Sequence, residues 1–234
     1  MEKLLSNTQT SADDIAQSYA LIRENMARAM AAAGRTDRVQ LMAVTKTVSP
    51  DRVNRAVQLG ADLLGENRVQ EFLEKRESYL PAQVHFIGSL QSNKVKYIID
   101  KITMIHSVDS LHLAEEIDRR AAQHGLVMDI LAEINIGGEE TKGGIAPAQA
   151  EEFCAQLRCL KNVRLRGLMT IPPPNCALRC YADMQALFVR LGEKLGGEFD
   201  TLSMGMSGDY ETAIKYGATI IRIGSGLFGY RKYL

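Results

Sequence analysis

Eight short apolar runs, each separated from the next by a segment of helical character, occupy the chain from Val39 onward. The runs cover residues 40–46, 61–67, 84–90, 104–108, 128–136, 163–171, 201–206 and 219–223, and the helical segments cover residues 50–59, 68–78, 92–99, 111–124, 147–160, 178–195 and 209–216. Short apolar runs suit parallel strands buried on both faces. An open doubly wound sheet would need fewer strands, so the count predicts an α/β fold of the (β/α)8 TIM-barrel class.

An amphipathic helix is predicted ahead of the barrel, over about residues 11–33, with Ser11 as a possible cap. Its apolar positions recur at spacings of three and four, at Ile15, Tyr19, Ile22, Met26 and Met30. The three consecutive prolines at 172–174 are too few for a domain linker. We therefore expect one domain over residues 1–234, with the first helix as an extension.

Composition narrows the class of protein further. The chain is 46% hydrophobic, enough for a real core, and its 28 basic and 28 acidic residues balance, which argues against disorder and against a polyanion-binding surface. The four cysteines, at 154, 159, 176 and 180, form no CxxC pair, which suggests a reducing compartment. Without a signal-like start or an apolar run of ~18 residues, a soluble, cytoplasmic protein is expected.

Lys46 is the first candidate functional residue, because it ends the first apolar strand on the same side as Met42 and Val44. Active sites of barrels lie at the C-terminal ends of the strands. Burial there would favour the neutral amine that carbonyl chemistry requires. The alternative is a lysine that extends to solvent from the end of a strand.

The loops after the seventh and eighth strands predict a phosphate site. They are rich in Gly and Ser, with Ser207 and Gly208 in the first and Gly224, Ser225 and Gly226 in the second. Such loops let backbone N–H groups approach an anion, and barrels often bind phosphate at this place. The alternative is a pair of ordinary Gly-rich turns. Gly224, Gly226 and Gly229 also match GxGxxG, but no βαβ unit follows, so a dinucleotide site is rejected.

Arg222 lies within the eighth apolar run, where a permanent cation needs a partner. A carboxylate such as Glu66 or Glu133 is one possibility. The other is a ligand, because a buried amine, a phosphate cup and an arginine aimed at a ring nitrogen describe a pyridoxal 5'-phosphate (PLP) site. An arginine cannot take the place of a carboxylate that protonates this nitrogen, so strong carbanion chemistry is not favoured. The four histidines show no metal-binding spacing, so no metal is expected.

The sequence resembles the pyridoxal phosphate homeostasis protein family (YggS/PROSC-type), relatives of the alanine racemase N-terminal barrel domain. Seven segments between about Val39 and Gly229 carry the resemblance: AVTK at 43–46, GENRVQE at 65–71, HFIGSLQSNK at 85–94, SVDS at 107–110, RGLMTIPP at 166–173, SMGMSGDYETAI at 203–214 and RIGSGLFG at 222–229. Together these segments are highly specific, although each one alone is weak.

The resemblance implies a fold-type III PLP-binding barrel with Lys46 as the Schiff-base lysine and Arg222 near the pyridine nitrogen. Ser207, Gly224 and Ser225 would hold the phosphate, and Asn67 would lie at the mouth near the lysine. It also implies a role in intracellular vitamin B6 and amino-acid homeostasis without an established catalytic activity. Possible partners are PLP-dependent apo-enzymes as transient recipients of PLP, and a monomer is expected.

Two departures from the family pattern stand out. Gly208 occupies a position that is often acidic, and the loop at 137–144 is longer than usual and could cover the cofactor. Two other functions stay open: a PLP-dependent amino-acid racemase, and a barrel enzyme acting on a phosphorylated metabolite. The racemase is disfavoured because the chain ends five residues after Gly229 and has no second domain to supply the opposing acid or base.

Overall fold

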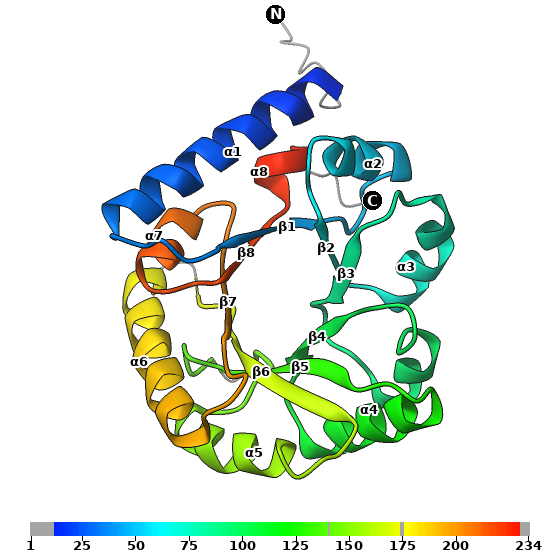
Figure 1. The fold of residues 1–234 in the computed structure, drawn as a ribbon, viewed down its shortest axis with the longest axis vertical. Helices are drawn as coiled ribbons and strands as arrows, with labels where there is room; N and C mark the ends of the chain where they lie inside the picture. The colour runs from blue at the N-terminus through cyan, green and yellow to red at the C-terminus, as the bar shows by residue number, and fades with distance from the viewer. Residues whose placement is uncertain (1–11, 140, 174–175, 230–234) are drawn as a thin grey trace, which may run out of the picture.

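A computed structural model describes residues 12–139, 141–173 and 176–229. Eight parallel strands form a closed barrel in chain order, with helices on the outside (Figure 1). The strands are β1 Gln40–Val44, β2 Leu63–Glu66, β3 Gln83–Phe86, β4 Met104–Val108, β5 Met128–Glu133, β6 Val163–Met169, β7 Thr201–Met206 and β8 Ile220–Ile223. The predicted (β/α)8 barrel is confirmed. The predicted Ser11 cap lies outside the described residues, as does Pro174.

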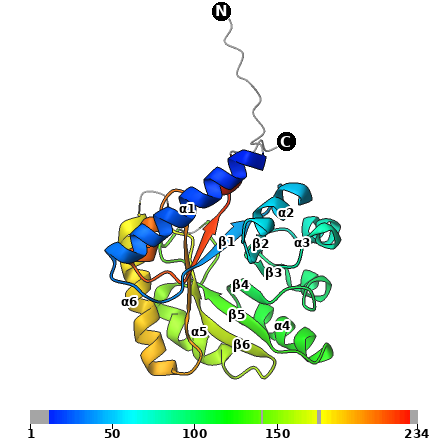
Figure 2. The ribbon, with the colours of Figure 1, turned by 45° about the horizontal axis from the view of Figure 1, so that its top comes forward.

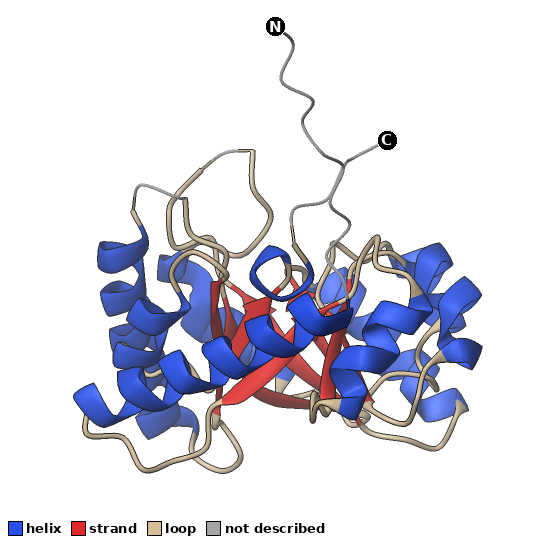
Figure 3. Cartoon of the chain, turned by 90° about the horizontal axis from the view of Figure 1, so that it is seen from above, coloured by secondary structure: helices blue, strands red, loops and turns tan. Residues whose placement is uncertain are grey.

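The helical elements surround the strands, as the cartoon coloured by secondary structure shows (Figure 3). They are α1 Ala12–Ala32, α2 Pro50–Gln58, α3 Val69–Lys75, η1 Arg76–Ser78, η2 Ser92–Tyr97, α4 Leu111–Gln123, η3 Pro147–Gln149, α5 Ala150–Leu157, α6 Ala177–Leu195, α7 Tyr210–Lys215 and α8 Ser225–Phe228. None of the helices within these described stretches has the length and apolar character needed to cross a membrane.

Several predicted bounds were wrong. Residues 92–99 form no α-helix but the 3-10 helix η2, the segment 147–160 divides into η3 and α5, and the short α8 was not predicted. Most strands end before the apolar runs do. Ile87 and Leu90 show the reason, because both are buried beyond the end of β3 without belonging to the strand. Apolar character reports burial, whereas a strand ends where backbone pairing with its neighbours ends.

Two apolar layers follow from the alternation of side chains along the strands. In β1, Leu41 and Ala43 belong to the large core shared with the helices. Met42 and Val44 point the other way, into a separate cluster with Leu63, Ile87 and Ile220. This smaller cluster fills the barrel interior beneath the C-terminal ends of the strands.

Helix α1 packs on the outside of the barrel, against α2, α7 and α8 (Figure 2). Asn25 donates a hydrogen bond to the Tyr210 hydroxyl (3.0 Å), and the Arg35 guanidinium donates to the carbonyls of Ile214 and Ala218 (2.7 and 2.8 Å). Helix α1 and the residues that directly follow it therefore hold α7 and the segment before β8, close to the predicted phosphate loops.

Candidate functional site

A cavity of about 460 Å³ opens at the C-terminal ends of the strands. It is lined by Val44, Lys46, Asn67, Ile87, Ile171, Met206, Ser207, Gly208, Arg222, Gly224 and Ser225. All six predicted binding residues are in this set: Lys46, Asn67, Ser207, Arg222, Gly224 and Ser225. The structure thus brings together residues from β1, β2, β7 and β8, although their roles toward a ligand stay predictions.

Lys46 lies in a tight turn two residues after β1 and is only partly buried, less than its apolar strand suggested. The next residue, Thr47, has a φ of 58°, a conformation that β-branched residues rarely adopt. A hydrogen bond from the Thr47 N–H to the Glu71 carboxylate on α3 holds this turn, and Lys75 pairs with the same carboxylate. Strained backbone held by its surroundings is a feature of functional sites.

Glu71 was not singled out by sequence reasoning. Burial would raise the pKa of this carboxyl, but the hydrogen bonds from Lys75 and the Thr47 N–H outweigh it and lower the pKa below its ordinary value. The charged carboxylate is therefore the form that anchors the lysine turn. The sequence separation between Thr47 and Glu71 does not predict this contact, because Thr47 follows β1 whereas Glu71 lies in α3, after β2.

Asn67 follows β2 and carries a buried side-chain oxygen, Oδ1, that has no hydrogen-bond partner within the described part of the chain. An unpaired buried polar atom in a cavity wall is costly unless a ligand or water meets it. Only glycine at position 88 leaves room for the backbone of Asn67, because a Cβ at Gly88 would come within 2.1 Å of the Asn67 carbonyl oxygen.

Two backbone N–H groups converge at the predicted phosphate loops. The N–H of Gly224 and that of Gly226 both donate to the Ser207 hydroxyl, at 3.3 and 3.0 Å. The Asp209 carboxylate stabilises the turn after β7 by accepting a hydrogen bond from the Met206 N–H (2.7 Å). This arrangement of N–H groups and a hydroxyl at the mouth of a barrel suits a phosphate group.

Arg222 lies at the base of the cavity with 4% of its surface exposed. Its guanidinium donates to the Ser203 hydroxyl (2.7 Å) and to the Thr170 carbonyl (2.8 Å). Burial lowers the pKa of Arg222, and Tyr181, Glu133 and Asp209 act in the opposite direction. A guanidinium does not deprotonate in proteins, so this site holds a buried positive charge.

Of the two possibilities for Arg222, a carboxylate partner such as Glu66 or Glu133 is not what the structure shows. Among the described residues, no carboxylate forms an ion pair with this guanidinium. Glu66 accepts hydrogen bonds from the Thr45 hydroxyl (2.6 Å) and the Tyr79 hydroxyl (2.7 Å). Glu66 follows the strand alternation, so its side chain faces the helix layer while Arg222 faces the interior.

Glu133 is the acidic group whose pKa is most affected near the site. Burial raises its pKa to about 7, with a further contribution from the Asp109 carboxylate, while Arg222 acts in the opposite direction. The carboxyl is therefore half-protonated near neutral pH and cannot serve as a full counter-charge to Arg222.

The loop at 137–144 does not supply a cavity wall from any of its described residues. Asn135 ties the loop back on itself, since its side-chain amide donates to the carbonyls of Glu139 and Lys142 and its Oδ1 accepts from the Glu139 N–H. The expectation that this loop covers a ligand stays a prediction.

Known proteins resemble this chain in both sequence and structure. The family model described as "Alanine racemase, N-terminal domain" matches residues 18–232. The pyridoxal phosphate homeostasis proteins of Aquifex aeolicus and Pseudomonas aeruginosa are 45% and 41% identical, over 91% and 96% of this chain and 96% and 97% of theirs. The solved structure of PipY of Synechococcus elongatus with PLP bound is 32% identical, with a TM-score of 0.80 over 92% of this chain and 100% of that chain.

Proposed function

Because this chain belongs to the pyridoxal phosphate homeostasis family, built on the alanine racemase N-terminal domain, we propose that it binds PLP at the cavity and serves in intracellular vitamin B6 and amino-acid homeostasis. The observation that carries the proposal is the meeting, in one cavity, of an amine, a buried cation and a pair of converging N–H groups. These three features match the aldehyde, the ring nitrogen and the phosphate of PLP.

The residues present fit this cofactor. Lys46 would bond through its amine to the aldehyde carbon, and the carbonyl oxygen would leave as water. Ser207, Gly224 and Ser225 would hold the phosphate, and Asn67 would use its unpaired oxygen at the cavity mouth. Arg222 would donate to the ring nitrogen and oppose its protonation. When bound, PLP supplies an electron-withdrawing ring, and an unprotonated nitrogen makes that ring a weaker electron sink.

We expect no robust catalysis, because the charges around the cavity do not favour protonation of the ring nitrogen. The group at the ring nitrogen would be a buried cation without a paired carboxylate among the described residues, and Glu133 is only partly ionised near neutral pH because burial raises its pKa to about 7. The protein would hold PLP in a form that other proteins can take up. Its recipients would be PLP-dependent apo-enzymes, with the protein acting as a cytoplasmic monomer.

The first experiment is the visible absorption of the purified protein with PLP, with the Lys46→Ala and Lys46→Arg variants measured alongside. Wild type is expected to show an absorption band that both variants lack, because arginine retains the charge but not the nucleophilic amine. Lys215→Ala, at an exposed position on α7, is the control and should retain the band. A band of equal strength in Lys46→Ala would overturn the assignment of Lys46.

The same samples test the rest of the proposal. Incubation with L-alanine should produce no appreciable D-alanine, and rapid racemisation would replace a homeostasis role with an enzymatic one. Addition of the loaded protein to a PLP-dependent apo-enzyme should restore its activity. Sedimentation of the loaded protein is expected to give the mass of one chain, and a dimer mass would contradict the monomer.

A further inference from the structure

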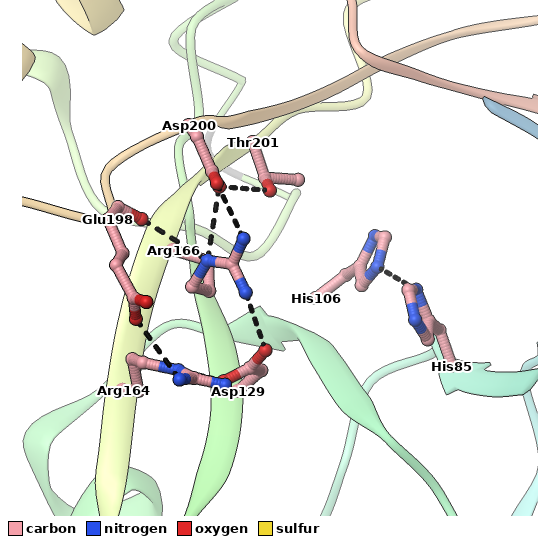
Figure 4. Close-up of polar contacts among 8 residues, drawn as sticks. All are labelled: His85, His106, Asp129, Arg164, Arg166, Glu198, Asp200 and Thr201. Carbon is pink, nitrogen blue, oxygen red and sulfur yellow. Dashed lines mark hydrogen bonds and ion pairs between the residues drawn. The ribbon is translucent and has the colours of Figure 1, made fainter. Parts of the chain in front are cut away.

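A chain of hydrogen bonds runs through the barrel interior from the base of the cavity. The Arg222 guanidinium contacts the Ser203 hydroxyl at 2.7 Å, that hydroxyl lies 3.0 Å from Nδ1 of His106, and Nε2 of His106 lies 2.9 Å from Nδ1 of His85. All four side chains are buried, with at most 5% of their surface exposed. Figure 4 shows the contact between the two imidazoles, which come from the adjacent strands β3 and β4.

The chemistry of Arg222 sets the first step of this hydrogen-bond network. A guanidinium only donates hydrogen bonds, so the Ser203 oxygen must accept from it. In the order that we infer for the rest of the network, the hydroxyl proton of Ser203 is donated to Nδ1 of His106. A neutral imidazole that accepts at Nδ1 carries its proton on Nε2, and so His106 donates to Nδ1 of His85. His85 in turn carries its own proton on Nε2.

Both imidazoles must be neutral for this order to exist. Burial lowers the pKa of His85 to about 4. Burial likewise lowers the pKa of His106 far below its ordinary value, and the nearby His85 and Arg222 add to that effect. A proton added to His106 would also place a second positive charge next to the Ser203 hydroxyl that Arg222 already occupies.

This series of hydrogen bonds gives the Arg222 guanidinium a partner that does not neutralise its positive charge. A carboxylate would satisfy the guanidinium but would also compensate its charge, whereas the Ser203 hydroxyl accepts a hydrogen bond from it and carries no negative charge. The Thr170 carbonyl supplies the second fixed point (2.8 Å). The two acceptors, one in β7 and one directly after β6, define the plane of the guanidinium and use two of its five N–H bonds.

We propose that Ser203, His106 and His85 are positioning residues that hold Arg222 as an oriented, uncompensated cation at the base of the cavity, directed at the ring nitrogen of PLP. The role toward PLP rests on the function proposed above. The order of protons along the chain does not, because it follows from contacts within the protein alone. A purely structural role, in which the histidines only fill the barrel, is the competing explanation.

The experiment compares PLP binding by wild type, Ser203→Ala, Arg222→Ala and the double variant. Ser203→Ala should raise the dissociation constant for PLP roughly tenfold, the effect of a hydrogen bond to a charged group. It should also shift the lysine-dependent absorption band. The double variant should bind no more weakly than Arg222→Ala, because Ser203 acts only through Arg222.

Ser107→Ala is the matched control. Ser107 is also a buried serine of a barrel strand, 2% exposed, and its hydroxyl donates to the Gly88 carbonyl (2.5 Å) instead of joining the chain. The same substitution there should leave the absorption band unshifted. Equal band positions in Ser203→Ala and wild type, or losses of affinity that multiply in the double variant, would overturn the positioning role.

Histidine NMR of the protein without PLP tests the proton order independently. In ¹⁵N-histidine-labelled wild type, the signals of His85 and His106 should both report a neutral ring protonated on Nε2. In Ser203→Ala, His106 should lose this fixed tautomer. A proton on Nδ1 of His106 in wild type would overturn the proposed order of hydrogen bonds even if PLP binds. Failure of wild type to bind PLP would overturn the proposed function, and the NMR result would still decide the proton order.

Discussion

At the scale of single residues, the position of Lys46 depends on Thr47, whose backbone has a conformation that threonine disfavours. Thr47 has a positive φ, which costs a β-branched residue of order 1–3 kcal/mol. The Glu71 carboxylate offsets this cost by accepting the Thr47 N–H, and it links the turn to α3. The position of the Lys46 amine therefore depends on a carboxylate in a different βα unit.

Replacement of Glu71 by alanine should loosen this turn and weaken PLP binding. We expect a loss of about fivefold to tenfold in affinity, equivalent to about 1–1.4 kcal/mol, because one charge-assisted hydrogen bond is removed. Equilibrium titration with PLP, followed by absorption, measures the effect. Glu74→Ala is the control on the exposed side of the same helix and should bind PLP as wild type does. Equal affinities of the two variants would show that the turn does not need Glu71.

The residues of the cavity were largely predictable, whereas the groups that support them were not. Lys46 and the Ser207 loop were expected from their places at the ends of strands, a rule of the fold, and Arg222 was expected because a permanent cation within an apolar strand needs a partner. Glu71, Ser203 and the two buried histidines act through contacts between strands and helices far apart in the chain. A sequence shows that a histidine is present, but only the closed barrel shows that His106 meets Ser203 across 97 positions.

At the scale of elements, β6 contains an irregularity that its sequence does not show. Its pairing with β5 shifts between Leu165 and Gly167, so Arg166 is an extra residue in the ladder. Gly167 has a φ of 149°, and a Cβ there would lie 1.9 Å from the Thr201 carbonyl oxygen of β7. The close approach of these two strands therefore requires glycine.

Two glycine-to-alanine variants should have opposite effects on stability. Gly167→Ala should lower the free energy of unfolding by about 3 kcal/mol or more, because backbone atoms must move to admit the methyl group. Gly192→Ala, inside α6, should raise it by up to about 1 kcal/mol, because its Cβ would meet only an ordinary contact at 3.6 Å. Urea unfolding measures both. A neutral Gly167→Ala would contradict the close approach of β6 and β7.

The bounds of the elements were predicted unevenly, for a physical reason. The bounds of β4 and β7 match the prediction, because in both the apolar run and the backbone pairing end together. In β1 and β2 the runs continue through Lys46 and Asn67, which have left the ladder and line the cavity instead. At these two strands, the residues that the prediction wrongly included are therefore residues of the site.

At the scale of the whole molecule, two buried groups act on stability in opposite senses between pH 5 and 7. The pKa of His85 falls from 6.5 to about 4 on folding, so its contribution is present above pH 6.5 and is lost as the pH falls. The pKa of Glu133 rises from 4.5 to about 7, so its contribution is present below pH 4.5 and is lost as the pH rises. His106 acts in the same sense as His85.

Replacing Glu133 by glutamine should make the pH dependence that the buried histidines give to the free energy of unfolding directly measurable. Between pH 5 and pH 7, the free energy of unfolding of Glu133→Gln should rise by about 2 kcal/mol more than that of wild type, because the opposing carboxyl no longer titrates. Urea unfolding at the two pH values measures the difference. Glu152→Gln, on the exposed face of α5, should follow the wild-type dependence. Parallel curves for Glu133→Gln and wild type would show that Glu133 ionises alike in both states.

The pairing that closes the barrel joins β1 to β8, from Gln40 and Ile220 to Ala43 and Ile223. Lys46 follows the first of these strands, while Arg222 lies in the last strand and Ser225 begins the helix after it, α8. A ribosome therefore releases the lysine long before the residues that would complete its surroundings, and the cavity arises only when the two ends of the barrel meet. If PLP binds as proposed, its capture would therefore require that β8 has been synthesised and has paired with β1, and a nascent polypeptide halted before β8 would leave PLP free for other proteins.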